Sequence, residues 1–449
     1  MNEERSSYRQ IMKATSLFGG VQLFQIIISI IRTKFVAILL GPSGMGIVGL
    51  LYSTIVLITG FTNFGLGTSA VKNISEANAS GNEERISSVV SVMRRLVWIT
   101  GIIGALFTLV FSRWLSEITF GNDDYTFAFV WISITLLTTQ LCRGQLVILH
   151  GLRKLKYLAK ANVYGSLSGL IITVPLYYFF GERGIVPVIV ATAFTTLFFS
   201  WFFSKKVKIK RTRVTKEIAL NEGKNMLSMG FVISLTGIFT ILGSYVLRIF
   251  INRAGDLADV GLYSAGFTLI DTYVGMIFTA MATDYYPRLT TVAKNNMLCS
   301  QNINQQAEIA ILILAPILII FLVFINWAIV LLYSSKFLAI TGMVYWASLG
   351  MFFKAASWAI AFVFLAKGAS MLYFKNELAS NSYGLILNLL GYFLGGLTGL
   401  GISFLLTFVL YLIQVYLIAR IKYQFSFKFS FVKIFIVQFT LALIVFSIV

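Results

Sequence analysis

Basic side chains stand inside segments of this sequence that are otherwise apolar. Arg32 lies in the run IISIIRTKFVAILL, and Arg143, Arg248 and Lys354 lie in similar runs. A cation at the centre of a bilayer costs roughly 2.5–3.5 kcal/mol on insertion scales, so such residues are rare and usually functional. Guanidinium and ammonium groups bind phosphate through charge-assisted hydrogen bonds. We therefore expect these side chains to form a binding site for an anion.

Polar residues just before and inside the first of these runs have the spacing of one helical face. Gln25, Ser29 and Arg32 succeed one another at intervals of four and three residues, which places them on one side of an α-helix. A polar stripe on an apolar helix indicates a face turned toward water. Gln25 and Ser29 are therefore predicted to line the same aqueous cavity as Arg32.

One acidic residue, Asp271, lies well inside an apolar run. Two roles fit it: a counter-ion for Arg32 or Arg248, or a proton or sodium site that couples transport to an ion gradient. Lys354 has no acid nearby in its own run, which favours exposure to a cavity.

Because bases outnumber acids within the apolar runs, we expect an interior with net positive charge. We expect Arg143 to lie near the cytoplasmic entrance of this interior.

The segments that carry these residues are long enough to cross a membrane. The chain has 449 residues, of which 58% are hydrophobic and 12% charged, whereas soluble domains carry about 25% charged residues. Apolar runs of about 20 residues alternate with short polar breaks, which is typical of transmembrane helices. The sequence predicts helices over 14–40, 46–70, 88–112, 126–150, 157–180, 184–203, 224–251, 259–284, 307–333, 338–366, 371–395, 397–419 and 431–449.

These helices predict an all-α polytopic membrane protein with two pseudo-symmetric six-helix lobes around a central cationic cavity. We expect an N-terminal lobe over 1–203, a basic cytoplasmic linker over 204–223 and a C-terminal lobe over 224–420. An extra helix falls in 421–449, as a true last span or one of a pair. A weak repeat relates 41–61 to 255–276 and favours lobes related by an axis along the membrane normal.

The distribution of basic residues predicts which side of the membrane each loop faces. Lys and Arg number 36 and give a net charge of +19, and cytoplasmic loops carry the excess of such residues. With a cytoplasmic N-terminus, the outer loops contain few of them: Arg113, Arg183, Arg253 and Lys336. The basic charge is thus predicted to face membrane lipids and not nucleic acid.

Other chemistry has little support in the sequence. Cys142 and Cys299 are far apart and form no metal-binding or disulfide pattern, so we expect no metal site and no cofactor. No glycine-rich phosphate loop followed by Lys-Ser/Thr is present, which disfavours ATP hydrolysis. A membrane glycosyltransferase or polymerase is the alternative from another class, but the pair Asp123 and Asp124 lies in an outer loop too short for a catalytic domain. We expect no catalytic residues.

Three motifs resemble those of a known transporter family. They are LLGPSGMGI after the first predicted helix, NFGLGTSAVKNI at the end of the second, and ADVGLYSAGFTLIDTYVGM in the second half. The chain resembles Wzx-type O-antigen translocases of the multidrug/oligosaccharidyl-lipid/polysaccharide exporter (MOP) superfamily. Lipid II flippases of that superfamily carry an arginine in the first helix, where Arg32 stands. An acid follows it in those relatives, whereas Thr33 follows it here.

The resemblance implies a flippase that works by alternating access. Its substrate would be a polyprenyl-diphosphate-linked oligosaccharide, such as an O-antigen unit of lipopolysaccharide. The flippase would move this substrate to the outer leaflet of the bacterial cytoplasmic (inner) membrane, and a polysaccharide polymerase is a candidate partner. Another anionic lipid-linked substrate such as lipid II is the alternative within the superfamily. A cationic drug is disfavoured by the basic interior.

Overall fold

The computed structural model of the protein describes residues 2–207, 209 and 216–448. Side chains are described from Gly20 onward, except those of residues 216–221, 225, 229, 231–233 and 236. Every regular element within these residues is a helix, as predicted. The chain forms two compact units, unit 1 (Met1–Gly44 and Leu50–Tyr245) and unit 2 (Met45–Gly49 and Val246–Val449). Of the predicted linker 204–223, residues 208 and 210–215 lie outside the described part.

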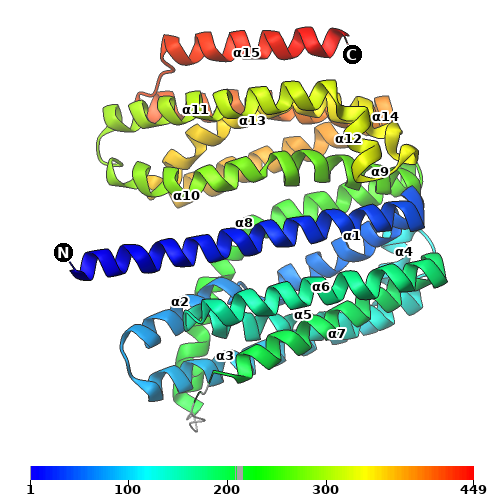
Figure 1. Ribbon diagram of the computed structural model, residues 1–449, viewed down its shortest axis with the longest axis vertical. Coiled ribbons are helices and arrows are strands. Elements are labelled where there is room, and N and C mark those ends of the chain that lie inside the picture. Colours follow the sequence, from blue (N-terminus) through cyan, green and yellow to red (C-terminus); the bar gives the residue numbers. More distant parts are fainter. Residues whose placement is uncertain (1, 208, 210–215, 449) are drawn as a thin grey trace. The chain divides into compact units, whose positions relative to one another are not determined.

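Unit 1 is a bundle in which α3, α5, α6 and α7 pack against one another (Figure 1). Its buried core lies between α2, α3 and α5 and includes Leu66, Ile74, Met93 and Ile148. The helices of this unit are α1 (Asn2–Thr62), α2 (Leu66–Ala79), α3 (Glu83–Val110), α4 (Ser112–Phe120), α5 (Thr126–Gly151), α6 (Leu155–Phe180), the 3-10 turn η1 (Gly181–Gly184), α7 (Ile185–Lys205) and most of α8 (Lys216–Ala254).

Unit 2 is organised around α13, which packs against α14 and α11. Most of the side chains of α13 are buried, including Phe352 and Phe364. The elements of this unit are α9 (Leu257–Phe267), the π-helix η2 (Thr268–Val274), α10 (Met276–Thr291), α11 (Asn296–Val323), α12 (Ile325–Leu332), the 3-10 helix η3 (Ser335–Ile340), α13 (Thr341–Ala366), α14 (Ser370–Tyr423) and α15 (Phe429–Ile448).

Two long helices each contain a pair of the predicted spans, joined without a loop. In α1 the backbone of Gly41 has φ 67° and ψ −169°, followed by Pro42, and this kink separates the predicted helices 14–40 and 46–70. In α14 the kink lies at Gly395 and Gly396. Glycine adopts these dihedral angles without the steric cost that a Cβ imposes. Short Gly-Pro and Gly-Gly sequences therefore turn the chain between adjacent spans.

Several predicted boundaries differ from the structure, and three of the differences change how the chain is divided into helices. The second predicted helix ends early, at Thr62, and α2 begins at Leu66 after the left-handed Gly65. The predicted helix 307–333 begins earlier, at Asn296, and is divided into α11 and α12. The predicted helix 259–284 is interrupted by the π-helix η2. The differences arise because hydropathy marks the apolar centre of a helix and not its capped ends.

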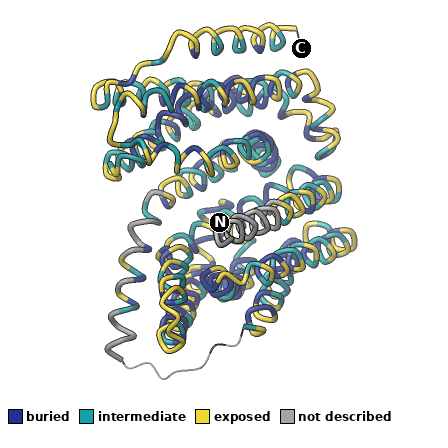
Figure 2. Tube along the Cα trace, turned by 60° about the vertical axis from the view of Figure 1, so that its left-hand side comes forward, coloured by how far each residue is buried: buried dark blue, intermediate teal, exposed yellow. Residues whose placement is uncertain are grey.

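The helices have the length and composition of membrane spans. Within the described residues, nine helical segments are long and apolar enough to cross a membrane, and three of them contain two predicted spans each: Gly20–Thr62, Leu155–Lys205 and Ser370–Tyr423. Many of their large apolar side chains are exposed at the surface of the units (Figure 2). Such a surface is stable in lipid and not in water. The protein is therefore a multi-pass membrane protein.

The predicted last segment contains the helix α15 (Phe429–Ile448), which packs against α11 and α13. Phe435 and Phe439 of α15 make ring contacts with Phe352 and Phe353 of α13. Ser430 donates a hydrogen bond to Glu308 at 2.6 Å. Exposed residues recur along the length of α15 (Figure 2), and many of them are apolar, such as Ile436 and Ile444.

Candidate functional site

A cavity of about 440 Å³, lined by both polar and apolar side chains, lies within unit 1, between α1, α5, α6 and α7. Three of the predicted site residues line it: Gln25 and Arg32 from α1 and Arg143 from α5. Hydroxyl and amide side chains complete the polar lining, among them Tyr52, Thr139, Asn162 and Ser166. Helices far apart in sequence thus bring two guanidinium groups and several hydrogen-bonding groups to one space.

The two arginines of this cavity lie away from the acidic side chains that the structure describes. Within the described part of the chain, no carboxylate lies within ion-pair distance of Arg32 or Arg143. Arg32 is half-buried and Arg143 is exposed. Gly169 of α6 faces Arg32, and a Cβ built there would lie in ordinary contact with Nη1, at 3.9 Å. Two uncompensated cations in this cavity make a site suited to an anion.

Ser29, which was predicted to share this cavity, does not line it. Its side chain is exposed and is not part of the cavity lining. The spacing of Gln25, Ser29 and Arg32 places all three on one side of the helix, but the neighbouring helices decide which part of that side faces the cavity. The lining also includes Tyr52 from the second half of α1 and Asn162 and Ser166 from α6, which the sequence analysis did not single out.

Lys354 and Asp271 form an ion pair in unit 2. The distance between Lys354 Nζ and Asp271 Oδ1 is 2.5 Å, and the exposed fractions of the two side chains are 23% and 46%. The Lys354 ammonium also lies over the rings of Phe404 and Phe408, at 5.6 and 5.1 Å from their centroids. The pairing arises because α13 packs against η2, which no spacing along the chain could indicate.

Asp271 therefore acts as a counter-ion, but to a partner that the sequence analysis did not consider. That analysis named Arg32 or Arg248 and expected Lys354 to stand without a neighbouring acid. Arg248, near the end of α8, lies over the ring of Tyr263 at 5.5 Å from its centroid. This cation–π contact lies outside the unit 1 cavity.

A second intramembrane acid, Glu377, escaped the sequence analysis because it lies early in α14. A directed chain of hydrogen bonds ends on its carboxylate. Gln414 Nε2 donates to Asn376 Oδ1 at 2.5 Å, Asn376 Nδ2 donates to the Tyr411 hydroxyl at 3.2 Å, and Tyr411 donates to Glu377. This chain joins the two halves of α14 and satisfies polar groups that lipid could not.

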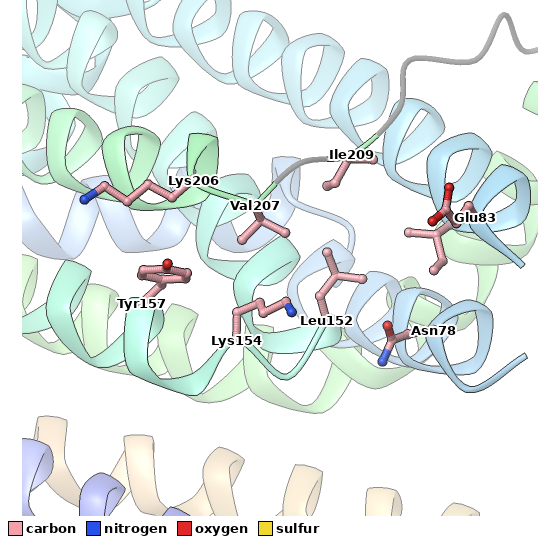
Figure 3. A pocket seen from close by; sticks show the side chains of 9 residues that line it. Asn78, Glu83, Leu152, Lys154, Tyr157, Lys206, Val207 and Ile209 are labelled. Atoms are coloured by element: carbon pink, nitrogen blue, oxygen red, sulfur yellow. The ribbon is translucent and has the colours of Figure 1, made fainter. Parts of the chain in front are cut away.

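A larger pocket of about 700 Å³ lies at the helix ends of unit 1 (Figure 3). Tyr157 and Lys206 lie at one end of it, Lys154 lies near its middle, and Asn78 and Glu83 lie at the other end (Figure 3). Its lining therefore carries both signs of charge. Such a mixed lining is less selective for anions than the cavity around Arg32.

The comparisons with known proteins identify the family. A sequence profile described as "Polysaccharide biosynthesis protein" matches residues 11–293, more than half of the chain. The chain belongs to this family. A search of curated protein sequences found no match. Membership of the polysaccharide biosynthesis family confirms the predicted area of function but does not name the substrate.

Solved structures show the fold of this family member. An inward-facing multidrug resistance MATE-family transporter of the MOP superfamily aligns with a TM-score of 0.73 at 16% identity, covering 89% of this chain and 94% of the other. The lipid II flippase MurJ, in an inward closed conformation, aligns with a TM-score of 0.68 at 12% identity. The alignment covers 96% of this chain and 97% of the other. A MOP-superfamily transporter from Pyrococcus furiosus aligns with a TM-score of 0.64 at 16% identity. The alignment covers 92% of this chain and 96% of the other.

These alignments confirm the predicted fold class. The polysaccharide biosynthesis family member is an all-helical, multi-span protein with the MATE- and MurJ-like fold.

Proposed function

We propose that the protein is a flippase that moves a polyprenyl-diphosphate-linked oligosaccharide, an O-antigen or related surface polysaccharide unit, to the outer leaflet by alternating access. The observation that carries the proposal is the unit 1 cavity, whose two arginines have no acidic partner among the described residues. A diphosphate offers oxygens on two phosphorus atoms, and the planar guanidinium matches their geometry. The family profile supports a role in polysaccharide biosynthesis.

In this proposal the side chains of the cavity have separate tasks. Arg32 and Arg143 hold the diphosphate, and Gln25, Asn162 and Ser166 donate or accept hydrogen bonds to the attached sugar. In unit 2, Lys354 and Asp271 form a separate ion pair, in which Asp271 tunes the charge of Lys354. The polyprenyl tail stays in the bilayer, where its transfer into the cavity would be unfavourable. The 1–203 and 224–420 lobes, joined by the 204–223 linker, move against each other.

The proposal also places the protein in the bacterial cytoplasmic (inner) membrane with a cytoplasmic N-terminus. The basis is the low number of basic residues in the predicted outer loops. The oligosaccharide substrate would then enter from the cytoplasmic side, and a polysaccharide polymerase on the outer side is the candidate partner that uses it.

The experiment is flipping of a fluorescent polyprenyl-diphosphate oligosaccharide by the purified protein in proteoliposomes. We expect Arg32→Ala and Lys354→Ala to abolish flipping and Arg32→Lys to retain part of it, because lysine keeps the charge but loses the planar fork. Arg113→Ala is the matched control, since Arg113 is 73% exposed and pairs with Glu117 and Asp123. Equal flipping by the Arg32→Ala and control variants would remove Arg32 from the mechanism.

The same assay separates the alternatives. Lipid II has the same polyprenyl-diphosphate headgroup chemistry but a different sugar, so the cavity's cations alone do not discriminate against it. Flipping of lipid II in preference to all other oligosaccharides offered would replace the proposed substrate. A lack of flipping of any anionic lipid by the folded wild-type protein would overturn the proposal as a whole.

A further inference from the structure

The larger pocket of unit 1, of about 700 Å³, lies where several helices of that unit end (Figure 3). Its lining comes from α2, α3, the turn between α5 and α6, and the end of α7. The apolar segments of α5 and α7 stop there. In a bilayer, the ends of such segments lie at the level of the lipid headgroups, so the pocket lies at that level.

One end of this pocket can bind an anion. It contains Tyr157 and Lys206, with Lys154 near the middle (Figure 3). Among the described residues, neither ammonium lies within ion-pair distance of a carboxylate. Glu83, the acidic residue of the lining, lies at the opposite end (Figure 3). Two ammonium groups and a phenolic hydroxyl offer the donors that phosphate oxygens accept.

An apolar stripe on α7 leads to this end of the pocket. Three phenylalanines precede Lys206 at intervals of four residues: Phe194, Phe198 and Phe202. This spacing places them on one side of the helix. All three rings are exposed, and the centroids of Phe198 and Phe202 lie 6.2 Å apart. The Lys206 ammonium lies 4.5 Å from the centroid of Phe202, so the stripe ends in a cation.

The neighbouring aromatic residues repeat this order of apolar ring and polar group. Lys205 lies over the ring of the exposed Trp201, at 4.9 Å from its centroid. The Tyr157 ring stacks on the buried Phe203 with centroids 6.3 Å apart. Trp and Tyr are enriched where acyl chains meet headgroups, because one part of each side chain is apolar and the other polar. This end of unit 1 therefore has the side chains of that boundary.

We propose that the pocket binds an anionic glycerophospholipid of the phosphatidylglycerol class. Lys154, Lys206 and Tyr157 bind its phosphate, and one acyl chain lies along the phenylalanine stripe of α7. Apolar rings followed by cations match the order of acyl chain and phosphate along the lipid. Basic pockets at the ends of membrane helices bind anionic headgroups. A zwitterionic headgroup would instead bring its ammonium close to two lysines, which is unfavourable.

The bound lipid would stabilise unit 1, because its headgroup contacts helices that are distant in sequence. A ligand that binds only the folded protein raises the free energy of unfolding according to its concentration and dissociation constant. Phosphatidylglycerol should therefore raise the unfolding temperature, and this rise should depend on the two lysines. The inference does not rest on the proposed function, since the pocket is separate from the cavity around Arg32.

The test measures binding of dioleoyl phosphatidylglycerol to the full-length protein in detergent micelles, by native mass spectrometry. A lysine beside an anionic headgroup contributes roughly fivefold in affinity. We therefore expect the pair Lys154→Gln/Lys206→Gln to weaken binding by about 25-fold and to lose the rise in unfolding temperature. The pair Lys154→Arg/Lys206→Arg keeps both charges and should retain most of the binding. If the glutamine pair does not fold, the single glutamine variants should each show the fivefold loss.

A matched control removes the same charge nearby. Lys156 and Lys160 are exposed on the first turns of α6 but do not line the pocket. Their double glutamine variant should therefore weaken binding less than about threefold. Equal losses in the two glutamine pairs would mean that the lipid responds to general surface charge, and the proposal would be overturned.

Two further probes test the class of ligand. Dioleoyl phosphatidylethanolamine has the same chains and should bind at least about fivefold more weakly than phosphatidylglycerol. Glycerol phosphate has the anion without the chains and should also bind much more weakly. Binding of either probe as tight as that of phosphatidylglycerol would refute the proposal, because the site would then lack selectivity for the charge or for the acyl chain.

The variant Arg32→Ala/Arg143→Ala separates this site from the proposed substrate cavity. It should bind phosphatidylglycerol within about twofold of wild type. A loss as large as that of the Lys154→Gln/Lys206→Gln pair would place the phospholipid in the substrate cavity and overturn the proposal. Failure to flip or bind any diphosphate substrate would refute the proposed function and leave the expected lipid binding unchanged.

Discussion

The cavity of unit 1 predicts how strongly each arginine contributes to diphosphate binding. A hydrogen bond to a charged group contributes about 1.5–3 kcal/mol, and ~1.4 kcal/mol corresponds to tenfold in affinity. Arg32 is half-buried, whereas Arg143 is exposed. Because solvent and salt screen exposed charges more strongly, we expect Arg32→Ala to weaken binding by about 30- to 100-fold and Arg143→Ala by about tenfold.

The assay is equilibrium binding of a prenyl diphosphate to the protein in nanodiscs at low and high salt. The loss caused by Arg143→Ala should shrink with added salt more than the loss caused by Arg32→Ala. If both arginines hold the same diphosphate, the double variant should depart from the sum of the single effects. Both single variants must unfold at the wild-type temperature for the comparison to hold. If both then bind the prenyl diphosphate with an affinity within twofold of wild type, the reasoning that unpaired cations in this cavity bind the anion is refuted.

Three further predictions concern the structure that holds the site. Phe352→Ala should destabilise the protein by about 3–5 kcal/mol, because the ring is fully buried in α13; Phe393→Ala, where the ring is 74% exposed, is the control in thermal unfolding. Tyr285→Phe should cost about 1 kcal/mol, since the buried hydroxyl donates to the Ala359 carbonyl at 2.6 Å, and no change relative to Tyr178→Phe would contradict this. Gly275→Ala should lower the unfolding temperature by disturbing the π-turn, whereas Gly243→Ala, whose Cβ would meet nothing within 4 Å in α8, should be neutral or stabilising.

The polar network around Glu377 shows what hydropathy overlooks. A single acid near the start of a long apolar segment barely changes its average hydropathy, so the sequence analysis counted Asp271 and missed Glu377. The hydrogen bonds from Asn376, Tyr411 and Gln414 form because the kink at Gly395 and Gly396 folds α14 back on itself. Residues more than thirty positions apart then meet within one helix.

The sequence by itself determined that this chain is an all-helical membrane protein, where most helices lie, and which side chains are unusual. The reason is that a backbone group without a hydrogen-bond partner is unfavourable in a bilayer. A run of about 20 apolar residues therefore spans it as an α-helix, which pairs its own backbone groups. A charge in such a run is conspicuous for the same reason, which is why Arg32, Arg143 and Lys354 could be singled out.

The tertiary structure decided which of these charges share a space and which neutralise each other. Arg32 and Arg143 line one cavity because α1 and α5 both border it, while Ser29, on the same side of α1, lies outside its lining. Lys354 meets Asp271 because α13 packs against η2. Helical periodicity places a residue on a face of its own helix, but the partner of that face depends on packing between helices distant in sequence.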